Sequence, residues 1–249
     1  MNLQFCIEYQ TYYGQDLVLN VITGRQFGDA NISQYRMHTA DGLHWLVDIN
    51  REVTPGSQLD YFYSVHVGDY EESREWVVAP HRIVFNSVDA LNYRIFDHWR
   101  VIPDNAYLYT SAITDCVVGS TIAKAGLKKI KRCVCLKVQA PQLGVGDELR
   151  LVGADPVLGA WKERKALKMV RQNVNEWIVC IDAASLASSK MEFKFLIENA
   201  SKEYSPLWEN CNNRTIELPV MEEGDTVVYE LDEAYFTLPP VRVAGTLVP

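Results

Sequence analysis

The chain has 249 residues, of which 48% are hydrophobic, 22% charged and 11% aromatic, and it carries a formal net charge of -8 with a pI near 5.2. This is the composition of a folded protein, and the length suits two domains of about 100 to 120 residues each. A phosphate backbone or an anionic membrane surface needs a cationic face, so we expect neither nucleic acid nor a membrane as a partner.

The N-terminus and the cysteines indicate the compartment in which we expect the protein. The opening MNLQFCIEYQ has no basic segment followed by an apolar stretch, and no window approaches the length of a membrane span, so we expect a cytoplasmic protein. The six cysteines form no CxxC pair and the five histidines show no metal-ligand spacing, which predicts no metal site and no cofactor. We interpret Cys133 and Cys135 as small apolar residues of one strand face in a reducing compartment.

Short strands dominate the first part of the chain. Residues 17–21, 44–49 and 60–67 are rich in β-branched or aromatic residues, alternate with a period of two and are bounded by Gly, Asp, Asn or Pro. No segment has the pattern of a long helix. This arrangement is typical of an antiparallel, immunoglobulin-like β-sandwich, which we place in residues 1–100.

The second part of the chain has the same character. After a predicted linker, residues 101–132, strand-like segments return at 149–153, 176–181 and 192–199, within a second sandwich predicted for residues 133–236. The tail TLPPVRVAGTLVP, residues 237–249, belongs to neither sandwich. We interpret it as the entry to a further domain outside this chain.

One fixed offset superposes the two parts. It aligns Trp45 with Trp177, Trp76 with Trp208 and Arg82 with Arg214, together with several apolar pairs of the strands. Self-similarity at one offset is the signature of a repeated unit. The sequence therefore predicts an all-β protein with two β-sandwiches in tandem. Trp45 and Trp177 precede alternating apolar residues, and we assign both to the core.

Two tryptophans of the second copy stand in polar surroundings. Trp161 follows a predicted strand end in LGAWKERK, and Trp208 lies in SPLWENCNNR. In KMEFKFLIE, alternation places Lys194 on the face opposite the core residues Phe193, Phe195 and Ile197. An exposed indole pair with amide and ammonium donors suits a neutral sugar, although half-buried core tryptophans would give the same pattern.

The second copy resembles the starch-binding domain, the family 20 carbohydrate-binding module. The resemblance covers about residues 133 to 232 and rests on LGAW, on the strand with Lys before Phe and on LWENCNNR, in that order. It implies a β-sandwich that binds α-glucans such as starch, glycogen or maltooligosaccharides. The principal site of that family maps onto Trp161, Lys194, Trp208 and Asn213. Arg214 is expected to brace its loop.

The first copy departs from this pattern. The sequence alignment places Ala30 opposite Trp161, Phe62 opposite Lys194 and His81 opposite Asn213, so the principal site is degraded there. Some family members have a second site around a tyrosine before the first conserved strand, and Tyr13 occupies that place. We therefore treat Tyr13 and Trp76 as secondary carbohydrate-binding candidates, with an ordinary exposed tyrosine as the alternative for Tyr13.

The tandem modules followed by AGTLVP are similar to the N-terminal region of bacterial 4-α-glucanotransferases, the disproportionating enzymes of the amylomaltase family. This resemblance implies a non-catalytic glucan-binding region whose partner is its own C-terminal catalytic domain. No paired carboxylates for glycosyl transfer can be identified in the chain, so we predict no catalytic residue. Two alternatives remain: a glycogen-targeting scaffold or regulatory protein, and structural modules that only orient a catalytic domain.

Overall fold

The computed structural model describes residues 1–23, 31–85, 89–102, 106, 129–140, 143, 146–173, 175–199 and 205–237. Regular structure in these ranges is almost entirely β-strand, which confirms the predicted all-β class. Most of the predicted linker, residues 101–132, and of the tail, residues 237–249, lies outside the described ranges. No helix within them is long and apolar enough to cross a membrane.

Within the described ranges the strands form two groups of nine, which we call the first and second modules. The first module contains β1 (Asn2–Glu8), β2 (Gln15–Thr23), β3 (Asn31–Arg36), β4 (His38–Thr39), β5 (His44–Asn50), β6 (Gln58–Val67), β7 (Tyr70–Arg74), β8 (His81–Val84) and β9 (Asn92–His98). The second contains β10 (Arg132–Gln139), β11 (Asp147–Gly153), β12 (Leu167–Lys168), β13 (Val170–Asn173), β14 (Glu176–Asp182), β15 (Lys190–Asn199), β16 (Leu207–Trp208), β17 (Arg214–Glu217) and β18 (Asp225–Leu231).

Strand pairing is the same in both modules. β1 pairs antiparallel with β5 and parallel with β9, and β10 pairs in the same way with β14 and β18. The antiparallel pairs of β2 with β6 and of β6 with β7 and β8 correspond to those of β11 with β15 and of β15 with β16 and β17. The two modules therefore share one pairing pattern, with a parallel pair in each that the sequence did not predict.

Alternation along the strands builds two separate cores. Leu3, Phe5 and Ile7 of β1 are buried in the first core, and Phe193 and Phe195 of β15 in the second. Trp45 and Trp177 are 4% and 6% exposed, which confirms their assignment to the core. Burial of apolar surface of this kind is the main stabilising contribution to each sandwich.

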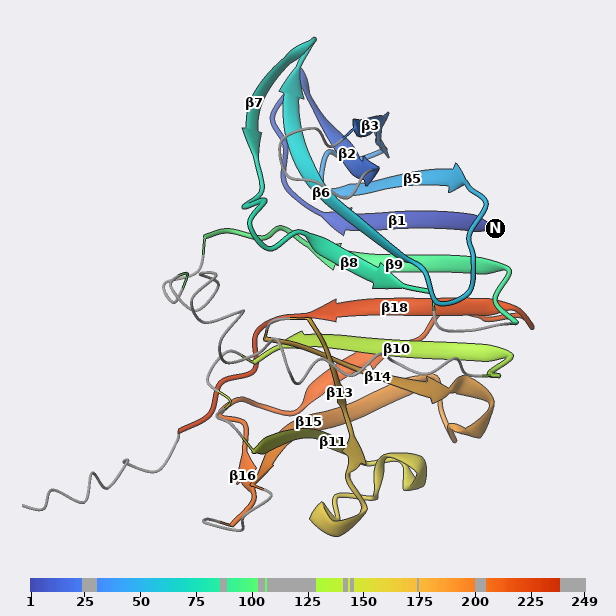
Figure 1. Ribbon diagram of the computed structural model, residues 1–249, viewed down its shortest axis with the longest axis vertical. Helices are drawn as coiled ribbons and strands as arrows, with labels where there is room; N and C mark the ends of the chain where they lie inside the picture. Colours follow the sequence, from blue (N-terminus) through green and yellow to red (C-terminus); the bar gives the residue numbers. More distant parts are fainter. Residues whose placement is uncertain are drawn as a thin grey trace, which may run out of the picture.

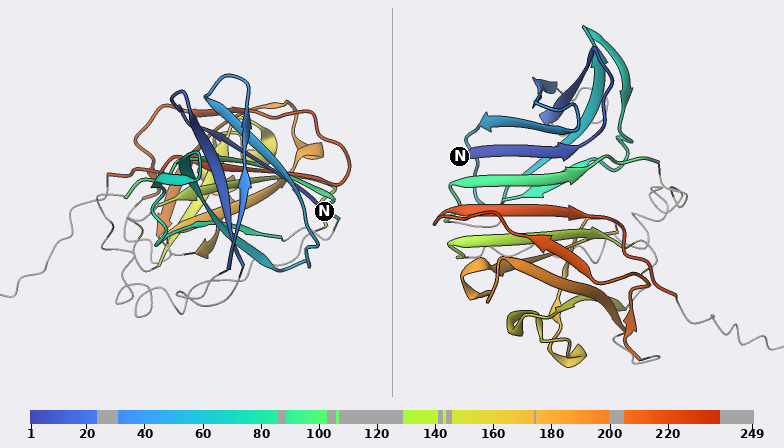
Figure 2. Two further views of the ribbon diagram at one scale, coloured as in Figure 1. Left: turned by 90° about the horizontal axis from the view of Figure 1, so that it is seen from above. Right: turned by 180° about the vertical axis from the view of Figure 1, so that it is seen from behind.

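The two modules share one continuous sheet. Its eight strands run in the order β13-β14-β10-β18-β9-β1-β5-β4, and the parallel pair of β18 with β9 joins the modules, from Asp225 opposite Asn92 to Tyr229 opposite Phe96. Figures 1 and 2 show this sheet running through the length of the molecule. The sequence predicted modules connected only by a linker, and it gave no sign of this direct pairing.

The two smaller sheets cover opposite faces of the shared sheet. Along β10, Val134 and Leu136 face the core of the second module, whereas Cys133 and Cys135 join the core of the first. Successive side chains of a strand point to opposite faces of its sheet. The face of the shared sheet that borders the first core is therefore, in the second module, the face turned away from the second core. The first module thus packs against the back of its neighbour.

A buried ionic cluster lies at this junction, with Glu230 of β18 at its centre. Glu230 accepts hydrogen bonds from His81 at 2.9 Å, Arg100 at 2.6 Å and Lys137 at 3.4 Å, and Glu75 lies 3.0 Å from the other nitrogen of His81. Burial alone would raise the pKa of Glu230, but Arg100 and His81 hold it well below its usual range.

His81 is the titratable cation of the cluster. Burial lowers its pKa, but the charges of Glu230 and Glu75 outweigh that effect and raise the pKa to about 9. His81 is therefore protonated at neutral pH and pairs β8 of the first module with β18 of the second. A buried pair of this kind adds little net stability, but removal of one partner leaves an uncompensated charge.

Candidate functional site

The outer face of β15 forms the floor of the candidate site. Lys194 is paired with Val152 of β11, and Leu196 is paired with Trp208 of β16, so all four side chains project away from the core. Phe193 on the other face of β15 is fully buried. The alternation predicted from KMEFKFLIE is therefore confirmed, with Lys194 displayed on the outer face.

A tight loop between β11 and β12 carries Trp161. Asp155 begins the 3₁₀ turn η3 (Pro156–Leu158), with its carboxylate accepting from the backbone N–H of Val157 at 2.8 Å. Gly159 has a φ of 95°, and a Cβ there would lie 2.9 Å from the carbonyl oxygen of Lys165, so only glycine fits. The backbone N–H of Trp161 donates to Gly153 at 2.9 Å, which ties the loop to the end of β11.

The backbone of Trp161 is itself unusual. Its φ of 58° lies in the left-handed region, where bulky residues are rare because the Cβ meets the following carbonyl oxygen. Such conformations persist only where the surrounding structure enforces them, and they concentrate at functional sites. The loop therefore holds the Trp161 indole in a position that an ordinary loop would not provide.

Trp161 and Trp208 form a pair on the outer surface. Their ring centroids are 6.4 Å apart with an interplanar angle of 36°. Both indoles are half-buried and pack on Val152, Ala166 and Leu196, three buried apolar residues that form a small cluster of their own. One side of each indole is thus supported by the protein, and the rest is left for contact with another molecule.

Polar side chains surround the two indoles. Lys194 donates through Nζ to the carbonyl oxygen of Glu209 at 3.4 Å, and the exposed Asn213 donates through Nδ2 to Glu192 at 2.7 Å. Glu192 lies two residues before Lys194, on the same face of β15. The structure therefore brings Trp161, Lys194, Trp208 and Asn213 to one surface.

Two acidic residues of this surface were not predicted. The indole Nε1 of Trp208 donates to Glu163 at 2.6 Å, and Glu192 accepts from Asn213. Glu163 belongs to the 3₁₀ turn η4 (Glu163–Lys165), which begins two residues after Trp161 in the chain. That closeness in sequence was the available signal, because a loop that places one indole also places its neighbours.

Beneath the site, Glu209 and Arg214 form an internal brace. Glu209 is 2% exposed, accepts from the backbone N–H of Phe195 at 3.0 Å and pairs with Arg214 at 3.1 Å. Arg214 also donates to the carbonyl oxygens of Asp232 and Glu233. Arg214 thus fixes the segment between Trp208 and Asn213, and its donors are occupied within the protein.

The strand registers correct the sequence alignment of the two copies. Ser64 of β6 is paired with Arg74 where Leu196 of β15 is paired with Trp208, so Arg74, and not Trp76, is the structural counterpart of Trp208. Tyr61 is paired with His81 where Phe193 is paired with Arg214, so His81 replaces Arg214 and not Asn213. The fixed offset fails because the turns of the two copies differ in length. The residues aligned with Trp161, around Ala30, lie outside the described ranges.

The outer face of β6 is closed where that of β15 is open. Phe62 replaces Lys194 and is 3% exposed, with the guanidinium of Arg74 lying 5.9 Å from its ring centroid. Beside it, Asn20 donates to Ser64 at 2.7 Å, and Ser64 contacts His66 at 2.9 Å, all three being buried. A polar network therefore occupies the place of the apolar cluster that supports the two indoles.

The two secondary candidates lie elsewhere on the first module. Tyr13 belongs to the turn before β2, and its side chain is as exposed as in an extended peptide, at 108%. Trp76 is half-buried and lines a cleft of about 170 Å³ between the modules, together with His98, Trp99 and Leu231. The structure does not bring either residue to the surface that holds Trp161.

Solved structures with some similarity to this chain include carbohydrate-active proteins. A glucoamylase from Hypocrea jecorina is 21% identical, with a TM-score of 0.35. The match covers 41% of this chain and 17% of the glucoamylase. The family 20 module of a maltotetraose-forming amylase from Pseudomonas saccharophila is 20% identical, with 40% of this chain and 99% of that one covered at a TM-score of 0.32. These similarities are too low to carry a functional argument.

Comparison by sequence is more specific. A search of curated proteins found no match. The family model described as "Starch binding domain" matches residues 132–228, a range that runs from the start of β10 into β18. The matched range contains both indoles, Lys194 and Asn213. The second module is thus matched to the starch-binding domain family, and this match supports the binding of starch or a related α-glucan.

Proposed function

We propose that the second module binds α-1,4-glucans, including starch, glycogen and maltooligosaccharides, across Trp161 and Trp208. The observation that carries this proposal is the pair of supported, half-exposed indoles, 6.4 Å apart and inclined by 36°. Two inclined platforms follow a curved chain of sugars better than one flat surface. The apolar face of each pyranose packs on an indole, and the packing excludes water from both surfaces.

The polar side chains around the two indoles recognise the sugar hydroxyls. Lys194 offers ammonium donors, and Asn213 offers both an amide donor and an acceptor. Glu163 and Glu192 supply carboxylate acceptors, and their existing bonds to Trp208 and Asn213 hold these side chains in place without a ligand. Preorganisation of this kind lowers the entropic cost of binding. The site offers binding groups for a neutral sugar, and we assign it no catalytic step.

For the whole protein we propose a 4-α-glucanotransferase whose catalytic domain follows residue 249 and is brought to its polysaccharide by this region in the cytoplasm. The support is the resemblance of the N-terminal modules and of the AGTLVP tail to that enzyme family. The chain itself is expected to be catalytically inactive. Incubation of the purified chain with maltotriose, followed by chromatography of the products, should show no disproportionation; any longer or shorter maltooligosaccharide would contradict this assignment.

Titration calorimetry with β-cyclodextrin tests the binding site directly. A base–aromatic stack in another class of complex is worth about 1 to 3 kcal/mol, so Trp161→Ala or Trp208→Ala should each weaken binding by about 5-fold to 150-fold. The matched control is Tyr70→Ala, which removes an aromatic side chain that is 73% exposed on the first module. It should leave the affinity unchanged. Absence of binding by the unaltered chain would favour a purely structural role.

A further inference from the structure

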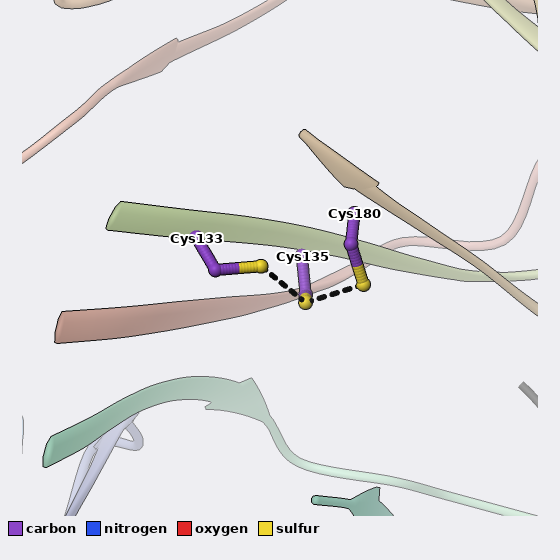
Figure 3. A group of neighbouring side chains, drawn as sticks. All are labelled: Cys133, Cys135 and Cys180. Atoms are coloured by element: carbon purple, nitrogen blue, oxygen red, sulfur yellow. Dashed lines mark hydrogen bonds between the residues drawn. The ribbon is translucent and has the colours of Figure 1, made fainter. Parts of the chain in front are cut away.

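Three cysteine thiols meet on the shared sheet, and none of them belongs to the glucan site. Cys133 and Cys135 lie on one face of β10, and Cys180 of β14 is the register partner of Cys135. The Sγ atoms of Cys135 and Cys180 are 2.7 Å apart, and those of Cys133 and Cys135 are 3.6 Å apart. Figure 3 shows the three side chains pointing toward one another, with Cys135 between the other two.

The three cysteines differ in burial. Cys133 and Cys135 are 1% and 2% exposed and belong to the core of the first module, beside Ile178 and Val228. Cys180 is only half-buried and packs against this core from its edge. Hydrogen bonds with the two neighbouring thiols and burial raise the pKa of Cys135 well above its usual range, which keeps that thiol neutral.

These surroundings favour a neutral product over a metal complex. A soft metal ion would be held by thiolates, and zinc sites usually have four ligands. In the described part of the chain the group comprises three sulfurs, with no imidazole or carboxylate among them. Three thiolates on a single ion would place a net negative charge among apolar side chains, which is costly. A disulfide introduces no charge.

We propose that Cys135 and Cys180 are an oxidation site that forms a reversible cross-strand disulfide on exposure to a hydroperoxide. The sulfur of the half-buried Cys180 attacks the outer peroxide oxygen; the O–O bond breaks, an alcohol or water leaves with the thiol proton, and Cys180 becomes a sulfenic acid. The Cys135 sulfur then attacks the Cys180 sulfur. The S–O bond breaks, and the hydroxyl leaves as water with the proton of Cys135. Two thiols and one hydroperoxide give one disulfide, one alcohol or water, and one water.

The backbone already places the two sulfurs for this step. A disulfide has a sulfur–sulfur distance of about 2.05 Å, and the ladder between β10 and β14 holds the two residues directly opposite each other. The two atoms therefore need to approach by well under one ångström. Cys133 is adjacent to Cys135 but is fully buried on the same strand, and we assign it no part in the linkage.

Treatment of the folded chain with hydrogen peroxide, followed by peptide mapping without reductant, tests the proposal. We expect a single linkage between the peptides that contain Cys135 and Cys180, a mass lower by two hydrogen atoms, and full reversal by a dithiol. The variant Cys180→Ser should lose the linkage. The matched variant Cys133→Ala should retain it, although it removes a thiol from the same cluster.

Thermal unfolding provides a second readout. A linkage that fits the native sheet should raise Tm by about 4 to 12 °C, because it restricts the unfolded chain. The proposal is overturned if the linkage forms only in denaturant, if it lowers Tm, or if Cys211, a cysteine exposed at the surface, is oxidised while Cys135 and Cys180 remain reduced. Stoichiometric binding of Cd²⁺ that requires all three thiols would assign the cluster to a metal and would also overturn it.

Discussion

The outer faces of β6 and β15 occupy equivalent positions in the two modules, but only one of them can support a sugar platform. Under Trp161 and Trp208 lie Val152 and Leu196, whose register counterparts in the first module are Asn20 and Ser64. An indole packs well on the apolar pair and poorly on a buried amide and hydroxyl that need hydrogen bonds. The residues beneath a platform therefore decide the function as much as the tryptophan itself.

A second difference concerns the buried acid that each module keeps behind this face. Glu209 and Glu75 both accept from a backbone N–H of the central strand, of Phe195 and Tyr63 respectively. The partner of Glu209 is an arginine, which stays charged at any accessible pH, whereas the partner of Glu75 is His81, which titrates. The first-module brace thus contains a cation whose charge is lost as pH rises through about 9, and the second-module brace does not.

The largest expected effect comes from breaking the brace of the second module. Arg214→Ala leaves the Glu209 carboxylate buried without its cation, and we expect a loss of about 3 to 5 kcal/mol in the free energy of unfolding. Urea denaturation measures it. The matched control is Arg36→Ala, whose ion pairs with Asp16 and Asp69 lie at the surface and should contribute at most about 1 kcal/mol. Similar losses for both variants would show that Arg214 is not a brace.

Replacing the apolar support with its first-module counterpart should come next. Leu196→Ser creates a cavity and buries a hydroxyl under the indoles, and we expect a loss of about 2 to 4 kcal/mol of stability. Affinity for β-cyclodextrin should fall as well, although both tryptophans remain. Leu46→Ser, at a leucine that is 43% exposed, is the control and should change neither quantity. Unchanged binding by Leu196→Ser would show that the two indoles bind glucan without the apolar residue beneath them.

The pH dependence of the first-module brace is smaller. The folded-state pKa of His81, about 9, lies above the unfolded value near 6.5, so its stabilising contribution is fully present below about pH 6.5 and is lost as pH rises through 9. At about 1.4 kcal/mol per pKa unit, the total is at most about 3.5 kcal/mol. Unfolding measured from pH 6.5 to 9 should show this decline, and His81→Gln should flatten it. An equal slope in the variant would exclude His81 as the cause.

The smallest effect concerns the secondary candidates. A weak site on the first module raises avidity for a long glucan through effective concentration and adds almost nothing for a short one. Tyr13→Ala and Trp76→Ala should therefore reduce retention in glycogen-containing gels a few-fold, with unchanged affinity for maltotriose by calorimetry. Tyr70→Ala again serves as the control. Equal losses on short and long ligands, or none on either, would reject this division between the modules.

The alternation of KMEFKFLIE was enough to predict which face of β15 is buried, and the resemblance of LGAW and LWENCNNR placed four residues that the structure brings to one surface. Local periodicity and short motifs carry this information because β-strand side chains alternate strictly. Turn lengths are less constrained, so a single offset aligned Trp76 and Arg82 with residues that are not their structural counterparts. The correct alignment of the two copies requires the strand registers, which only the hydrogen-bonded strand pairs of the structure reveal.

The junction could not be predicted, because no local pattern encodes it. Lys137, Glu176 and Glu230 are charged residues inside strands, which by composition alone indicate a solvated face, yet each is less than 9% exposed. Arg100 and His81, the partners of the two glutamates, come from the other module. Pairing across 76 to 149 positions depends on the arrangement of whole sheets, and a single sequence does not reveal it.

The parallel pair of β9 and β18 also has a consequence for how the chain can be divided. Each of these strands would be the unprotected rim of its own sandwich, with a row of free N–H and C=O groups that invite pairing with another chain. Here each module covers the rim of the other. A second module produced alone would expose β18 together with Val228 and Cys135, and it should self-associate where the intact chain does not.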